Sequence, residues 1–189
     1  MKTTEIIGGY LKDVAAVLDR MSVKDIERVV NVIADARRHG KKVFFFGNGG
    51  SAATASHFVC DMAKGTVRKD KPRIKAFCLT DNLPLLSAWA NDTAYENVFA
   101  EQLENIIEAG DVAVAISGSG NSPNVLKGVA VARAKGATTV GLTAFEGGKL
   151  KAMVDVPLVV PVHSMEQAED VHLILDHVIA VCLRGAEDN

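Results

Sequence analysis

Two glycine- and serine-rich loops constrain the fold of this chain more than any other feature. The first spans residues 47–51 (Gly-Asn-Gly-Gly-Ser) and directly follows the apolar run 43–46. The second spans residues 117–122 (Ser-Gly-Ser-Gly-Asn-Ser) and directly follows the apolar run 112–116. Glycine lets backbone N–H groups approach an anion closely, and a helix that begins at the loop adds a positive dipole end. The pair of loops therefore predicts a site for a phosphorylated small molecule.

Short apolar runs alternate with helical segments from residue 41 onward. The sequence predicts strands at 42–46, 74–79, 112–116, 138–142 and 156–160. It predicts helices at 50–64, 84–91, 94–108, 122–135 and 165–184. Such alternation favours an α/β domain with a parallel sheet covered by helices on both faces. Right-handed crossovers then place both loops at the edge of the sheet where ligands bind.

The first forty residues predict two helices that precede the first strand. Ser22 is a suitable N-cap for the second helix, and Gly40 ends it. Two interpretations of this apolar helical hairpin remain open. It packs against another subunit, or it forms a lid over the core of its own chain.

Composition excludes several classes of function. The chain has 189 residues and a net charge of −2, which fits one domain (1–189) with no broad attraction to nucleic acid or an anionic membrane. The basic stretch 64–75 lacks interleaved aromatic residues, so it is expected to be a solvated loop. The three cysteines show no paired spacing, and the N-terminus lacks a secretory signal, both of which favour the cytoplasm.

Neither loop matches a nucleotide-binding motif. The first lacks both the G-x-G-x-x-G spacing and the Gly-Lys-Ser/Thr ending, so we expect no nucleotide cofactor. One glycine turn between a strand and a helix is often only a turn. Two turns rich in serine and asparagine instead favour binding of phosphate or sugar hydroxyls.

At this point the sequence resembles a known family. The matching segments, in order, are Phe-Gly-Asn-Gly-Gly-Ser-Ala-Ala (46–53), His-Phe (57–58), Ala-Asn-Asp-Thr-Ala-Tyr (90–95), Ile-Ser-Gly-Ser-Gly-Asn-Ser (116–122), Gly-Leu-Thr (141–143) and Gly-Gly-Lys (147–149). Together they resemble the sugar isomerase (SIS) domain family and, within it, the phosphoheptose isomerases. They also resemble a non-enzymatic relative, the initiator-associating protein of bacterial replication.

The resemblance implies a flavodoxin-like five-stranded parallel sheet (41–189), preceded by an oligomer-forming helical hairpin (1–40). It implies a homotetramer with active sites between subunits. The implied reaction converts D-sedoheptulose 7-phosphate to a heptose 7-phosphate for bacterial surface heptose. The implied substrate-binding residues are Asn48, Gly49, Gly50, Ser51, Asn91, Asp92, Ser117, Gly118, Ser119, Ser122 and Glu169.

An aldose–ketose isomerisation needs a base that removes a C–H proton and an acid that polarises the carbonyl. His57 and Asp61 lie four residues apart on one predicted helix and share a face. Glu169 and His177 lie eight residues apart on the last helix, within one broad stripe. The resemblance implies that Asp61 is the general base and His177 the general acid. The family usually has glutamate at position 61 and glutamine at position 169.

These four side chains also suit a metal ion. His57, Asp61, Glu169 and His177 are two imidazoles and two carboxylates, which is an acceptable set for zinc or another divalent metal. Some members of the resembled family hold a metal at the matching cluster. A plainer interpretation also remains open, in which His57 and Asp61 are an ordinary helix-surface pair and Glu169 belongs to a solvated acidic first turn.

Three functions compete on this sequence. The first is a phosphosugar isomerase of the phosphoheptose type, and the second is an isomerase of another phosphosugar. The third is a non-catalytic SIS module that binds a protein partner. The acid–base set favours an enzyme, because a scaffold has no need to bring residues 57, 61, 169 and 177 together.

Overall fold

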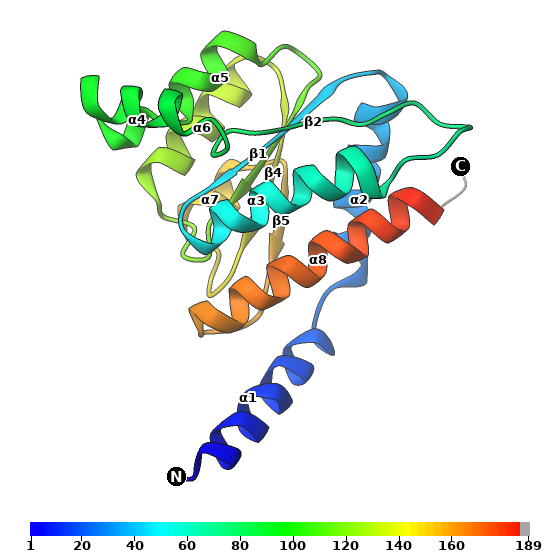
Figure 1. Ribbon diagram of the computed structural model, residues 1–189, viewed down its shortest axis with the longest axis vertical. Helices are drawn as coiled ribbons and strands as arrows, with labels where there is room; N and C mark the ends of the chain where they lie inside the picture. Colours follow the sequence, from blue (N-terminus) through cyan, green and yellow to red (C-terminus); the bar gives the residue numbers. More distant parts are fainter. Residues whose placement is uncertain (186–189) are drawn as a thin grey trace.

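The computed structural model describes residues 1–185 and contains a sheet of five parallel strands, in the order β2-β1-β3-β4-β5 (Figure 1). The last four residues of the predicted core, 186–189, lie outside the described residues. The strands are β1 (Lys42–Gly47), β2 (Lys75–Cys78), β3 (Val112–Ile116), β4 (Thr138–Thr143) and β5 (Val156–Val159). This order is the flavodoxin-like one, so the predicted fold class is confirmed.

The helices are α1 (Thr3–Leu18), α2 (Val23–Arg38), α3 (Gly50–Cys60), α4 (Leu83–Asp92), α5 (Ala100–Ile106), α6 (Pro123–Ala134), α7 (Gly148–Met153) and α8 (Met165–Gly185). Two predicted helices are divided. The segment 50–64 ends as an α-helix at Cys60 and continues as a π-helical turn, Asp61–Gly65. The segment 94–108 splits into a 3₁₀ turn, Tyr95–Asn97, and α5. Helix α7 was not predicted, because it is short and begins at a glycine pair that is typical of a loop.

The sheet separates two hydrophobic layers. Val43 and Phe45 of β1 pack in the layer that contains α2, α3 and α8. Phe44 and Phe46 pack in the opposite layer, with α5, α6 and α7. Successive side chains of a strand point to opposite faces, so a strand that is covered on both faces must be apolar throughout. This requirement explains the run Val-Phe-Phe-Phe of β1, which lies between β2 and β3 in the interior of the sheet.

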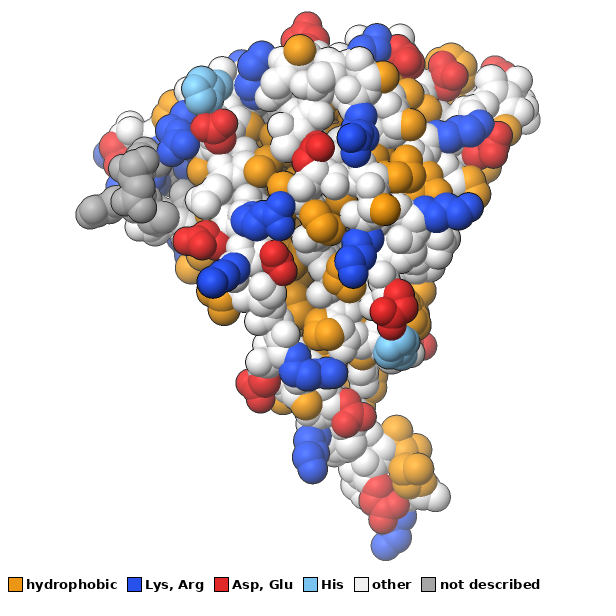
Figure 2. Space-filling view, turned by 180° about the vertical axis from the view of Figure 1, so that it is seen from behind, with side chains coloured by type: hydrophobic (Ala, Val, Ile, Leu, Met, Phe, Trp, Pro, Cys, Tyr) orange, Lys and Arg blue, Asp and Glu red, His pale blue; other side chains and the backbone are white. Residues whose placement is uncertain are grey.

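The two N-terminal helices have different environments. Helix α2 belongs to the core layer, where Val29 and Ile33 are fully buried, and the Ser22 side chain caps it by accepting from the Asp25 N–H. Helix α1 projects from the body (Figure 1), and the space-filling view shows it as a narrow extension with hydrophobic side chains at its surface (Figure 2). Ile6, Ile7 and Leu11 are 55%, 54% and 65% exposed. Helix α1 still contacts the body, through Val17 in the core layer and through the Tyr10 hydroxyl, which donates to the Asp170 carboxylate of α8, whereas its exposed residues Ile6, Ile7 and Leu11 do not pack on the core.

Among the described residues, no helix combines the length and the apolar character that a membrane crossing requires.

Candidate functional site

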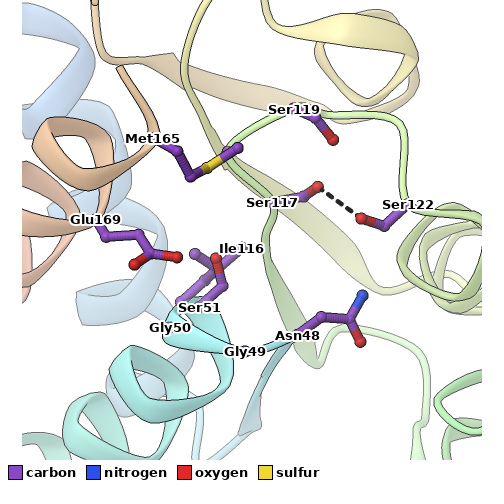
Figure 3. Close-up of a pocket in the computed structure, with 11 residues that line it drawn as sticks. Asn48, Gly49, Gly50, Ser51, Ile116, Ser117, Ser119, Ser122, Met165 and Glu169 are labelled. Atoms are coloured by element: carbon purple, nitrogen blue, oxygen red, sulfur yellow. Dashed lines mark hydrogen bonds between the residues drawn. The ribbon is translucent and has the colours of Figure 1, made fainter.

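The two glycine- and serine-rich loops lie side by side. Strands β1 and β3 are neighbours, and Gly47 at the end of β1 pairs with Ile116 at the end of β3. The strand order reverses between these two strands, which is where open α/β sheets bind ligands. A pocket of about 250 Å³ opens there (Figure 3). Its lining residues are Asn48, Gly49, Gly50, Ser51, Ile116, Ser117, Gly118, Ser119, Ser122, Met165 and Glu169.

Backbone hydrogen bonds hold the second loop in shape. The Gly120 N–H donates to the Ser117 carbonyl and the Leu150 N–H to the Gly120 carbonyl, each at 2.9 Å. Gly120 has a φ of +64°, and a Cβ at this position would meet the Gly147 carbonyl oxygen. Only glycine fits such a position without distortion. The loop is therefore preorganised, and the unpredicted helix α7 supplies part of its support.

Neutral donors dominate the pocket. The Ser117 and Ser122 hydroxyl oxygens lie 3.2 Å apart (Figure 3), and Ser51 sits in the first turn of α3. No lysine or arginine lines the pocket among the residues that the structure describes. An anion in this pocket would be held by hydroxyls, by backbone N–H groups and by the N-termini of α3 and α6.

Asn48 is fixed by partners that sequence reasoning missed. Its side-chain amide exchanges hydrogen bonds with the amide of Asn124, at 2.9 and 2.8 Å, and its Oδ1 also accepts from the Tyr95 hydroxyl at 2.9 Å. Asn124 is 2% exposed. The sequence showed only an asparagine in the first turn of a helix that follows a loop, and not that it is buried. Together these bonds fix the orientation of Asn48 at the pocket wall.

Asn91 and Asp92 lie elsewhere. Both are exposed at the end of α4, where the Asn91 amide donates to the Asp92 carboxylate at 2.8 Å. Neither lines the pocket formed by the described residues of this single chain. Their contact with a sugar stays a prediction.

A second group of polar side chains gathers where α3 and α8 pack together. It consists of His57, Asp61, Asp176 and His177, whose ligand atoms lie within 4.8 Å of one another. The two imidazole Nε2 atoms are 3.2 Å apart. The Asp61 Oδ2 atom lies 3.9 Å from that of His57 and 3.8 Å from that of His177. Three of the four predicted metal ligands therefore meet, and the cluster could hold a metal ion.

Asp176 is the member of this cluster that sequence reasoning missed. It is fully buried, and neither carboxylate oxygen has a hydrogen-bond partner among residues 1–185. Burial, and to a smaller extent the nearby charge of Asp61, raises the pKa of Asp176 to about 7. An acidic residue on the apolar stripe of α8 that includes Val171 and Leu175 was the available signal.

Glu169 does not join the cluster. Its carboxylate lies against Gly50, where an added Cβ would meet it, and so it faces the pocket (Figure 3). Eight residues of α-helix span about 12 Å, which separates Glu169 from His177 along α8. Asp176, and not Glu169, therefore stands beside His57, Asp61 and His177, while Glu169 lies with the serine loops, and its role as a metal ligand stays a prediction.

His172 lies on α8 between these two regions. It is fully buried, and its Nε2 is 3.2 Å from the Thr143 carbonyl, to which it donates. Burial lowers the pKa of His172 to about 4. It is a structural residue that ties α8 to the end of β4.

The comparisons with known proteins agree with this geometry. The SIS domain model matches residues 9–144. A phosphoheptose isomerase of Geobacter sp. (strain M21) is 40% identical over 82% of this chain and 80% of its own length. Another, from Aliarcobacter butzleri, is 34% identical over 90% of this chain and 89% of its own length. The solved phosphoheptose isomerase GmhA of Neisseria gonorrhoeae is 29% identical, with a TM-score of 0.91 over 98% of this chain and 100% of that one.

Paired loops at the switch point of a flavodoxin-like sheet, matched by the domain model, define a SIS-domain protein. SIS domains serve several functions, so the curated relatives decide the next step. Their identity and coverage show that the chain belongs to the phosphoheptose isomerase family, whose members are aldose–ketose isomerases.

Proposed function

We propose that the protein isomerises D-sedoheptulose 7-phosphate to a heptose 7-phosphate that supplies bacterial surface heptose. The observation that carries this proposal is the shared scaffold of the two regions. We call the pocket that Ser51, Ser117, Ser119 and Ser122 help to line the serine pocket, and the group His57, Asp61, Asp176 and His177 the His/Asp cluster. Helices α3 and α8 line the serine pocket near their N-termini and lead to the His/Asp cluster further along. One substrate can therefore reach both regions, with its phosphate in the pocket and its carbonyl end at the cluster.

The spacing of the two regions suits a seven-carbon sugar. Gly50 lines the pocket, and His57 lies seven residues further along α3. Seven residues of α-helix rise about 10 Å. This separation is comparable to the distance between the phosphate and the carbonyl of an extended seven-carbon sugar phosphate.

Asp61 and His177 are assigned the proton transfers. The Asp61 carboxylate removes a proton from C1 of the ketose while the His177 imidazolium protonates the C2 carbonyl oxygen, which gives an enediol. Asp61 then returns its proton to C2, and His177 takes the proton of the C1 hydroxyl as the aldehyde forms. The contact of 3.8 Å between the two side chains supports their action on neighbouring carbons.

The donor set is also suited to zinc or another divalent metal, at one ion per subunit. A metal held by the imidazoles and carboxylates would polarise the substrate carbonyl. His57, Asp61 and His177 would hold the ion, and the ion would then supply the polarisation of the carbonyl that the His177 imidazolium supplies without it. We propose no nucleotide cofactor.

We further propose a cytoplasmic homotetramer with active sites between subunits. The exposed apolar residues of α1 support an interface between copies of the chain. Cys60, Cys78 and Cys182 are free thiols, which supports a reducing compartment.

An assay with five-, six- and seven-carbon ketose phosphates tests the function directly. We expect conversion of sedoheptulose 7-phosphate at a kcat/KM well above that of the shorter sugars. Faster turnover of a five- or six-carbon substrate would replace the heptose assignment with another phosphosugar. Absence of turnover on every substrate, in protein whose fold and metal content are verified, would favour the non-catalytic alternative.

A further inference from the structure

Asp176 stands where the predicted ligand set had Glu169. We propose that Asp176 is a direct metal ligand and completes the donor set formed by His57, Asp61 and His177. This inference rests on the proposed metal site of the isomerase and names a ligand that the resemblance does not supply. Glu169 is left to the substrate pocket.

The separations of the four donor atoms are close to those of a metal site. Tetrahedral zinc with ligands at about 2.0–2.1 Å has neighbouring ligand atoms about 3.3 Å apart. The two Nε2 atoms are 3.2 Å apart. The Asp176 Oδ2 atom lies 3.9 Å from the Nε2 of His57. The Asp61 Oδ2 atom lies 3.9 Å from the Nε2 of His57 and 3.8 Å from the Nε2 of His177. Small side-chain movements would bring all four donors onto one ion.

The contact atom distinguishes a ligand from a group that only orients the histidine. A carboxylate that orients a metal-binding imidazole accepts from the ring nitrogen that does not face the metal. Asp176 instead faces Nε2 of His57, the same nitrogen that faces Asp61 and His177. Asp176 therefore points at the centre of the cluster and not at the back of His57.

The burial of the Asp176 carboxylate also favours a metal ion beside it. Both oxygens of Asp176 are buried without a hydrogen-bond partner in the described chain, and a second carboxylate, that of Asp61, lies in the same cluster. A buried carboxylate without a partner is strongly unfavourable, and a like charge nearby makes it more so. A divalent cation would balance the two carboxylates and satisfy Asp176 directly. Water reaches His57 and His177, whose side chains are 44% and 54% exposed, so the ion has an open path.

Metal affinity in a matched pair of variants tests the assignment. Asp176→Asn removes the charge and keeps the shape, while Glu169→Gln makes the same chemical change on the other carboxylate of α8. Zinc and cobalt affinities are measured by chelator competition, and bound metal is measured by elemental analysis. We expect about one ion per wild-type chain. We expect Asp176→Asn to weaken zinc binding by more than about tenfold, and Glu169→Gln to change it by less than about twofold.

Thermal unfolding provides a readout that does not depend on catalysis. We expect zinc to raise the Tm of the wild type and of Glu169→Gln, and to raise that of Asp176→Asn much less. Without metal, Asp176→Asn should melt no lower than the wild type, because it loses a buried charge and no hydrogen bond. Asp176→Leu, an apolar replacement, provides a second variant if the asparagine variant does not fold.

Wild-type zinc affinity in the Asp176 variants would overturn the inference. So would an equal loss of affinity in Glu169→Gln, or a wild-type protein that binds no stoichiometric metal. If that metal-free protein still isomerises the heptose phosphate, the proposed function stands and only the ligand assignment falls. If the metal data are as expected but no sugar turns over, the ligand assignment stands and the proposed function falls.

Discussion

The serine pocket and the His/Asp cluster lie on the same two helices but are built in opposite ways. The pocket is lined mainly by hydroxyls and backbone groups, with Glu169 as its one carboxylate among the described residues, and its second loop is held by internal backbone hydrogen bonds such as that from Gly120 to Ser117. The cluster is charged, and Asp176 within it lacks a hydrogen-bond partner in the described part of the chain. The second loop of the pocket is therefore held in shape by its own hydrogen bonds, whereas the cluster leaves a buried carboxylate without one among residues 1–185. Binding and chemistry should respond differently when each region is altered.

The largest effect is expected at the cluster. Asp61→Asn should lower kcat on sedoheptulose 7-phosphate by about a thousandfold, because an amide cannot accept the proton from carbon. Steady-state kinetics measures this loss, and circular dichroism and gel filtration verify that the fold and the assembly persist. Asp35→Asn, the same change at an exposed carboxylate on α2, is the matched control and should retain activity. Unchanged turnover in Asp61→Asn would remove Asp61 from the mechanism.

The second-largest effect is expected on the stability of the fold, at His172, which lies on α8 between the two regions. His172 has a pKa of about 4 in the folded protein and an ordinary value of 6.5. Between these values the unfolded chain binds a proton that the folded chain does not, so stability falls as the pH drops from about 6.5 to about 4. The full loss is roughly 3 kcal/mol, and none of it is present above about pH 7.

Urea unfolding of the wild type and of His172→Asn, across this pH range, measures that contribution. Asparagine does not titrate, so the variant should lose this part of the pH dependence. His163→Asn, at an exposed histidine, should keep it. Identical pH profiles for the wild type and His172→Asn would show that burial does not lower the pKa of His172 in the fold.

The smallest effect is expected at the pocket. Ser119→Ala should raise KM by on the order of tenfold and leave kcat nearly unchanged, because it removes a donor to a phosphate that does not react. Ser87→Ala, at an exposed serine of α4 whose hydroxyl donates to the Pro84 carbonyl, is the matched control. A fall in kcat with an unaltered KM would refute the assignment of Ser119 to the phosphate. It would mean that the pocket takes part in the chemical step as the cluster does.

The sequence predicted the pocket better than the cluster, for a physical reason. Apolar runs and glycine turns are local signals, so the strands, both loops and their shared edge follow from spacing alone. Asp176 and Asn124 could not be assigned in the same way, because their importance comes from burial, which only the packing of α3 and α6 against the rest of the chain creates. The sequence also grouped Glu169 with His177, but a shared stripe on a long helix does not mean a shared position along its axis.

Helix α8 is continuous from Met165 to Gly185 and carries Glu169 and His177 on one rod. Point substitutions can change what each residue offers, but they cannot shorten the interval between them. A scaffold of this kind would adapt to a substrate of another length by gaining or losing residues in the rod, or by folding the substrate itself. Selectivity for the length of the substrate would then depend on the number of residues in the helix, which a single substitution does not change.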